Sequence, residues 1–147
     1  MKQAERRIFL IHELLDEQSR YDNLAIPLET AEQKQLLLSL MNVRRPGKIS
    51  SYFLTVQDEY LRQETAEKGV TDLADLSPIS EGIYLWQGDI TALRCGAIVN
   101  AANSGMTGCY APCHNCIDNC IHTYAGVQLR LACAISLAHS SRSCTPA

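Results

Sequence analysis

Residues that could bind a metal ion gather in one short stretch of the chain, residues 109–116. Cys109, His114 and Cys116 follow the spacing C-x4-H-x-C, which puts two thiols and one imidazole into a single loop. Thiolate sulfur and imidazole nitrogen are preferred ligands of zinc, and catalytic zinc sites keep one position open beside three protein ligands. The spacing therefore predicts a metal site with room for water or substrate.

Cysteine usage supports the same interpretation. The chain has seven cysteines, an odd number, and five of them lie within residues 88–130. In a reducing compartment such a cluster favours metal binding over a disulfide framework. Taken alone, the spacing is also compatible with redox-active thiols or with no function. We expect Cys113 and Cys120 to have no role, although Cys113 is near enough to compete as a ligand, and we expect His122 to be structural.

Length and composition limit the possible classes of protein. With 147 residues, 46% of them hydrophobic, the chain is suited to one domain, or to a small domain with an extension. The net charge is −3 and acids and bases are mixed, so nothing favours nucleic acid or an anionic membrane as a partner. We find no targeting signal and no long apolar run, and expect a soluble, cytoplasmic protein. Nothing in the sequence indicates an oligomeric state.

The first part of the chain, residues 1–79, is predicted to be a helical extension without a catalytic constellation. Apolar residues in 2–17 recur at helical spacing, and His12 beside them is expected to be partly buried. A second helix should begin at Thr30 with a capping box, and a third should run from residue 50 or 51 to Lys68. Its inward residues are expected to be Phe53, Val56, Tyr60 and Leu61. Arg44 and Arg45, after the second helix, are compatible with a phosphate contact or with a solvated turn.

Residues 80–135 predict the opening of an α/β fold. Residues 83–87 have the composition of a strand, and the apolar run at 97–101 is typical of a buried parallel strand. In parallel sheets, ligands bind at the carboxyl ends of the strands. Asp89, Asn100 and Asn103 would lie there. Asn100 could contact a ligand or only the backbone at the strand end, and Asp89 could also cap the turn that follows it.

Four motifs in this order resemble a known family. GDIT (88–91), AIVNAAN (97–103), the C-x4-H-x-C loop and IDNCIH (117–122) are similar to the first part of a macrodomain, the α/β/α module that binds ADP-ribose. The cysteine-histidine loop resembles that of the zinc-containing macrodomains that act as protein-ADP-ribose hydrolases. The resemblance covers about residues 80–133 and implies a three-layer α/β/α sheet, here incomplete, after the helical extension.

The resemblance also implies roles for individual residues. Asp89 matches the carboxylate that accepts a hydrogen bond from the adenine amino group, with the backbone of Ile90 close by. Asn103 matches the amide that holds the distal ribose, and Asp118 matches an acidic residue beside that ribose. Both are candidate catalytic residues. Cys109, His114 and Cys116 match the zinc ligands of that family.

The sequence departs from this family after Cys133. Residues 136–147 have no strand pattern, and we expect them to be irregular, as in a truncated product. The main hypothesis is a zinc-dependent hydrolase that removes ADP-ribose from mono-ADP-ribosylated proteins, with turnover by this shortened chain itself left open. The alternatives are an ADP-ribose-binding module without catalysis and a small zinc-stabilised structural protein.

Overall fold

Helices dominate the computed structural model, which describes residues 1–140. The α-helices are α1 (Gln3–Asp16), α2 (Thr30–Val43), α3 (Ser51–Lys68), α4 (Ile117–Tyr124) and α5 (Val127–Ser140). The strands are β1 (Thr71–Asp72), β2 (Pro78–Ser80), β3 (Ile83–Tyr84) and β4 (Leu93–Arg94), and 3-10 turns lie at Ser19–Tyr21, Leu73–Asp75 and Ile90–Ala92. Within residues 1–140, no helix has both the length and the apolar character needed to cross a membrane.

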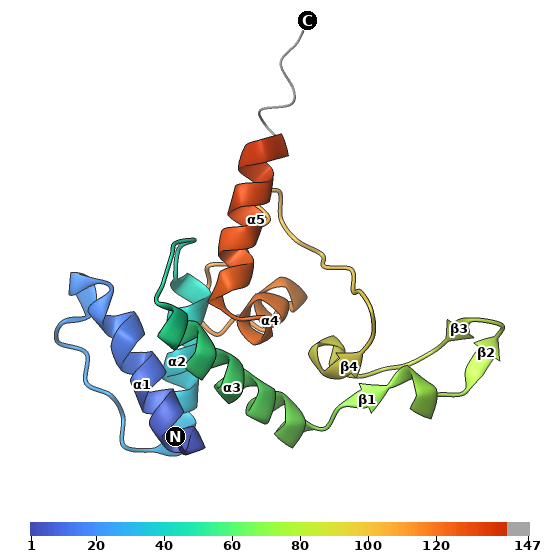
Figure 1. Ribbon diagram of the computed structural model, residues 1–147, viewed down its shortest axis with the longest axis horizontal. Coiled ribbons are helices and arrows are strands. Elements are labelled where there is room, and N and C mark those ends of the chain that lie inside the picture. Colours follow the sequence, from blue (N-terminus) through green and yellow to red (C-terminus); the bar gives the residue numbers. More distant parts are fainter. Residues whose placement is uncertain (141–147) are drawn as a thin grey trace, which may run out of the picture.

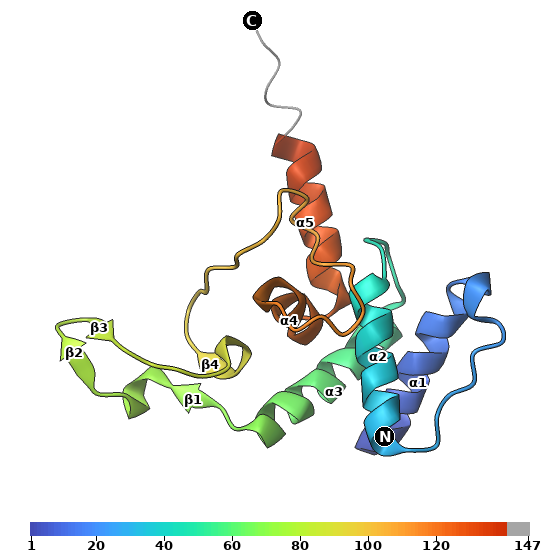
Figure 2. The same ribbon diagram turned by 180° about the vertical axis from the view of Figure 1, so that it is seen from behind.

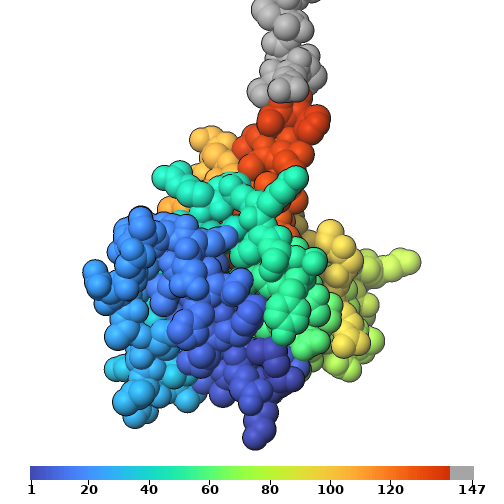
Figure 3. Space-filling view, turned by 60° about the vertical axis from the view of Figure 1, so that its left-hand side comes forward, coloured from blue at the N-terminus to red at the C-terminus, as the bar shows by residue number. Residues whose placement is uncertain are grey.

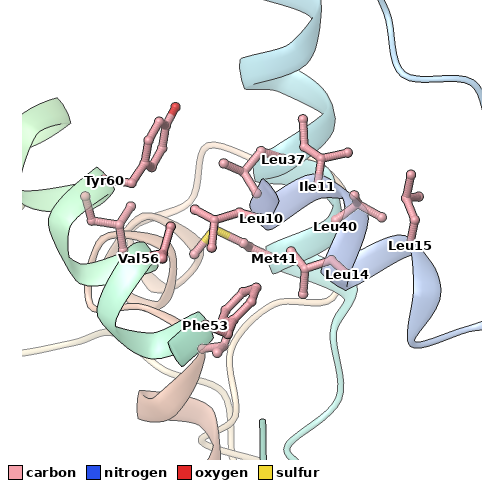
Figure 4. Packing of buried hydrophobic residues seen from close by; sticks show 12 residues of the cluster. Leu10, Ile11, Leu14, Leu15, Leu37, Leu40, Met41, Phe53, Val56 and Tyr60 are labelled. Atoms are coloured by element: carbon pink, nitrogen blue, oxygen red, sulfur yellow. The ribbon is translucent and has the colours of Figure 1, made fainter. Parts of the chain in front are cut away.

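The hydrophobic core lies between α1, α2 and α3. Leu10 and Ile11 of α1 and Phe53 of α3 are fully buried, and Leu37 of α2 is 2% exposed. Figure 4 shows these side chains pointing toward one another from the three helices. Val127 at the start of α5 joins the same cluster. In the space-filling view, helix α1 packs against its neighbouring segments without a gap (Figure 3). Helices α1, α2 and α3 with this core are called the helical body below.

The three N-terminal helices follow the sequence pattern closely. Helix α3 spans Ser51–Lys68, is capped by the Ser50 hydroxyl and ends at Gly69, whose φ of 88° favours glycine. Two details differ from the prediction. Helix α2 does begin at Thr30, but its N-cap is Glu29 and there is no capping box. His12 is exposed, because it lies on the side of α1 away from α2 and α3.

The strands are short and form two separate pairs. β1 pairs with β4 in parallel, and β2 pairs with β3 as an antiparallel hairpin that extends away from the helices (Figures 1 and 2). The mixed α/β class is confirmed, with the sheet incomplete. The strand expected at residues 97–101 is wrong. This segment has no regular structure, and Val99 within it is 89% exposed. An apolar run forms a buried strand only between neighbouring strands, and residues 1–140 provide none beside it.

The end of the described chain also differs from expectation. Residues 136–140 were expected to be irregular, but they continue helix α5 to Ser140. Alanine and leucine are frequent in this helix and have high helix propensity, which explains the continuation. The remaining part of the predicted tail, residues 141–147, lies outside the described residues.

Candidate metal centre

Helix α4 and the loop before it carry the candidate metal ligands. Cys116 is the N-cap of α4. Asn119, one turn into the helix, donates hydrogen bonds of 3.0 Å to the carbonyl oxygens of Ala111 and His114. The Asn119 side chain is buried, so these bonds are shielded from water. These two bonds from Asn119 hold the loop against the start of α4 and bring His114 toward Cys116.

Two buried side chains hold the loop from other helices. Asn42 of α2 accepts a hydrogen bond from the Cys113 backbone N–H at 2.9 Å and donates one to Thr123 Oγ1 of α4 at 2.7 Å. Arg130 of α5 donates to the carbonyl oxygen of Cys109 at 3.3 Å. The loop is therefore fixed at both ends and at its middle by α2, α4 and α5, which meet behind it (Figure 2).

The three candidate ligands converge on one point. One donor atom from each of Cys109, His114 and Cys116 lies within 4.8 Å of the other two. Cys109 Sγ and His114 Nδ1 are 3.5 Å apart. Tetrahedral zinc with ordinary bond lengths requires a sulfur–nitrogen separation of about 3.5 Å and a sulfur–sulfur separation of about 3.8 Å. The donor types and their spacing therefore fit a zinc ion with little movement of the loop.

Cys113 does not join this group in the described residues. Its Sγ lies 3.5 Å from the carbonyl oxygen of Gln35 and 3.7 Å from Ser39 Oγ, both on α2. Its backbone φ is 52°, an unusual value for a residue other than glycine. This conformation turns the Cys113 side chain toward α2, so the competing fourth ligand considered from the sequence is not assembled here.

A buried polar group lies on the inner face of α4. Asp118, 4% exposed, accepts a hydrogen bond from Asn100 Nδ2 at 2.8 Å through Oδ1, and His122 Nε2 lies 3.5 Å from the same oxygen. Burial lowers the pKa of His122, and the nearby Arg130 lowers it further, although Asp118 opposes both effects. His122 is therefore held mainly neutral and buried, which agrees with a structural role.

The predicted nucleotide-binding residues lie at separate places. Asp89 forms an ion pair of 3.0 Å with Lys68 and accepts hydrogen bonds from the Thr91 N–H and hydroxyl, so it caps the next turn. Burial alone would raise the pKa of Asp89, but the bonds from Thr91 and Lys68 outweigh it and lower the pKa. Asn103 is exposed and bonds within its own loop, accepting from the Gly105 N–H at 2.9 Å and donating to the Gly108 carbonyl.

One cavity is lined both by the metal loop and by Asp89, the candidate contact to adenine. Asp89 and His114 both line a cavity of about 260 Å³ between α2, α3 and α4. Lys68 also lines it, with its ammonium 3.2 Å from the centre of the Tyr124 ring. Ile90 instead lines a neighbouring cavity of about 290 Å³. Of the sequence candidates, the structure brings Asp89 and His114 together, whereas Asn100, Asn103 and Asp118 line neither cavity.

Sequence reasoning missed the residues that position this site. Lys68, Asn42 and Arg130 each contact residues far away in the chain; Asn42 and Cys113, for example, are 71 positions apart. A lysine in the last turn of a helix is common for reasons unrelated to ligands, so Lys68 carried no signal of its own. For Asn42, the only signal in the sequence is an asparagine that follows the apolar residues of α2 directly.

Comparisons with known proteins give three informative relatives. Over 138 residues, 91% of this chain and 53% of the relative, the sequence is 58% identical to a "Protein-ADP-ribose hydrolase" of Treponema medium. It is 44% identical over 136 residues, 92% of this chain and 51% of the relative, to a protein of the same name from Staphylococcus aureus strain Mu50. A "Probable bifunctional ADP-ribose hydrolase/ADP-ribosyltransferase" of Fusarium oxysporum f. sp. cubense is 42% identical over 72% of this chain and 20% of its own length. No family model matches the chain. The chain spans about half the length of the first two relatives.

Proposed function

We propose that this chain, a homologue over most of its length of proteins named protein-ADP-ribose hydrolase, carries the metal-binding part of a zinc-containing macrodomain that removes ADP-ribose from mono-ADP-ribosylated proteins. The observation that carries this proposal is the convergence of Cys109, His114 and Cys116 in a chain with such relatives. Thiol ligands require reducing conditions, so we also propose that the protein acts in the cytoplasm.

The donor set supports zinc as the cofactor. Two thiolates and one imidazole are typical zinc ligands, and three protein ligands leave one coordination position for a water or a substrate oxygen. Zinc bound there would polarise a ribose oxygen or lower the pKa of a bound water toward about 7. The exposed ring of His114 and the half-buried cysteines leave this position accessible from solvent. A ligand atom can therefore approach the metal loop from solvent.

Asp118 is the proposed general base. Asn100 and His122 both contact its Oδ1, and within residues 1–140 no hydrogen bond to Oδ2 is formed. Oδ2 would accept a proton from the attacking water as that water adds to the anomeric carbon of the distal ribose. The bond between this carbon and the modified side chain breaks in the same step. Asn100 holds the carboxylate in position for this transfer.

Asp89 and Asn103 are the proposed contacts to the nucleotide and its distal ribose. Asp89 would accept a hydrogen bond from the adenine amino group, with the backbone of Ile90 beside it. The hydrogen bonds from Thr91, together with Lys68, lower the pKa of this carboxyl group and so favour its ionised form. Asn103 would exchange its bonds to Gly105 and Gly108 for the ribose hydroxyls. Asn103 is exposed, so its side chain is accessible to such hydroxyls, although the bond to Gly108 that it would give up is partly buried.

ADP-ribose binding without hydrolysis is the second candidate function. Asp118 does not line the cavity shared by Asp89 and His114, so the proposed base is apart from the nucleotide contact in this chain.

One experiment separates these two functions. The purified chain is loaded with zinc, titrated with ADP-ribose by calorimetry and assayed for release of ADP-ribose from a mono-ADP-ribosylated protein. We expect zinc-dependent release that Cys116→Ser abolishes together with metal content. Cys133→Ser, a cysteine of α5 outside the metal group, should retain both. Binding of ADP-ribose without any release would select the second candidate. If the zinc-loaded chain neither binds ADP-ribose nor releases it from the modified protein, the proposal is contradicted.

A further inference from the structure

A third cavity lies beside the metal loop and is lined by Tyr110 and Pro112 of that loop. It has a volume of about 440 Å³ and is lined by the connector after α1, the end of α2 and the loop itself. Its polar lining includes Arg20, Tyr21, Arg45 and Tyr110. The volume is within the range of about 300–1,000 Å³ found for ligand sites. None of these residues takes part in the hydrolase chemistry described above, and we call this cavity the arginine–tyrosine groove.

Each arginine of the groove is stacked on a tyrosine. The guanidinium carbon of Arg20 lies 4.6 Å from the ring centre of Tyr21, and that of Arg45 lies 4.9 Å from the ring centre of Tyr110. Stacking orders the planar guanidinium and leaves its N–H edge available for a bidentate contact with a carboxylate. The groove therefore presents two ordered cationic groups, from two different elements.

These two charges are not neutralised within the described residues. No acidic group of residues 1–140 lies within ion-pair distance of Arg20 or Arg45. The neighbouring Arg44 is different, because it is buried and bound to both oxygens of Glu17 at 2.7 Å. Of the two arginines after α2, Arg44 therefore has a structural role, and Arg45 is available to a ligand.

The groove shares a wall with the candidate metal centre. Tyr110 directly follows the ligand Cys109, and Pro112 lines the groove two positions before the ligand His114. Arg130 stacks on the same Tyr110 ring at 4.6 Å and donates to the Cys109 carbonyl oxygen, which fixes this wall. A protein that presents a modified side chain to the metal must lay its neighbouring residues over the adjoining surface, and the groove is part of that surface.

From these contacts we propose that the arginine–tyrosine groove binds an acidic segment of the ADP-ribosylated protein, with carboxylates on Arg20 and Arg45. This inference rests on the proposed function for the identity of the partner, but the binding itself needs neither zinc nor ADP-ribose. The two guanidinium groups are stacked on two different tyrosines, Tyr21 and Tyr110. Two side-chain carboxylates along an extended chain would suit this arrangement better than a single phosphate. The groove would thus select substrates by charge beside the modified residue.

The test measures binding of fluorescein-labelled hexaglutamate to the whole chain by fluorescence anisotropy at low salt. Arg20→Gln with Arg45→Gln removes both charges and keeps most of each stem over its ring. We expect this double variant to bind about tenfold or more weakly, since each charge-assisted contact is worth more than a neutral one. The lysine pair, Arg20→Lys with Arg45→Lys, should recover part of the affinity. Arg62→Gln, an exposed arginine of α3 outside the groove, is the matched control and should bind as the unmodified chain does.

Three results would overturn the inference. The first is failure of the unmodified chain to bind hexaglutamate more tightly than hexaglutamine. The second is equal affinity of the Arg20→Gln, Arg45→Gln variant and the unmodified chain. The third is binding of inorganic diphosphate, measured by calorimetry, that the Arg20→Gln, Arg45→Gln variant loses while hexaglutamate does not bind, which would make the groove a phosphate site. Cys116→Ser should leave peptide binding unchanged, so a failure of the hydrolase proposal can be told apart from a failure of this one.

Discussion

Replacement of Asn42 by alanine tests whether the helical body holds the metal loop. The Asn42 side chain is 3% exposed and joins α2 to the Cys113 backbone N–H and to the Thr123 hydroxyl. Alanine removes both bonds and leaves the buried Thr123 hydroxyl and the partly buried Cys113 N–H without this partner. Each lost buried hydrogen bond costs about 1–2 kcal/mol, so the free energy of unfolding should fall by about 2–4 kcal/mol.

Part of this lost free energy should also appear as a weaker affinity for zinc. The bond to Cys113 orders the loop between the ligands Cys109 and His114, and its loss must be compensated when zinc orders the loop again. About 1–2 kcal/mol taken from the binding free energy weakens zinc affinity by about 5- to 30-fold. Zinc affinity is measured by competition with a chromophoric chelator, and stability by urea unfolding of the metal-free chain.

Two comparison variants make the result specific. Thr123→Val removes only the bond between α2 and α4, so it should lower stability with little change in zinc affinity. Asn23→Ala, an exposed residue of the connector, should change neither quantity. If Asn42→Ala binds zinc as tightly as the unmodified chain while its stability falls, the loop does not depend on α2 and this reasoning is refuted.

Two further predictions concern residues behind the loop. Since burial lowers the pKa of His122, its neutral form stabilises the fold above about pH 6.5, and this contribution should be lost as the pH falls through the lowered pKa. Urea unfolding between pH 7.5 and pH 5 should show this loss, and His122→Asn should make the pH dependence shallower; an unchanged slope would argue against it. Gly108→Ala should destabilise the chain by about 1–3 kcal/mol, because φ is 89° and an added Cβ would lie 2.9 Å from Arg130 Nη2. Gly96→Ala, with nothing within 4 Å, is the control, and equal melting temperatures for the two variants would contradict the argument.

Local patterns in the sequence predicted the three N-terminal helices and the close approach of Cys109, His114 and Cys116. The inward residues Phe53, Val56, Tyr60 and Leu61 are all buried, and α3 stops at Gly69. Helical spacing and a glycine stop depend only on nearby residues, so one sequence is enough to find them. The same holds for the loop at 109–116, whose ligands are close because they are neighbours in sequence.

Features that depend on distant segments were not predictable in this way. The run at 97–101 has the composition of a buried strand, but a strand forms only where a partner strand is present, and Val99 is exposed instead. Asp89 was assigned to adenine from a resemblance, and its ion pair with Lys68, 21 positions away, could not be seen in the sequence. Asn103 likewise bonds within its own loop. Tertiary contacts decide the partners of these side chains.

The most direct test of the central claim is zinc-edge X-ray absorption on the purified, zinc-loaded chain. We expect two sulfur ligands at about 2.3 Å, one imidazole nitrogen at about 2.0–2.1 Å and one further light ligand that exchanges with added anions. Cys113→Ser should leave this spectrum unchanged, because Cys113 Sγ is turned toward α2. A third sulfur that disappears in Cys113→Ser, or a chain that binds no zinc because Cys109 and Cys116 are oxidised to each other, would contradict it.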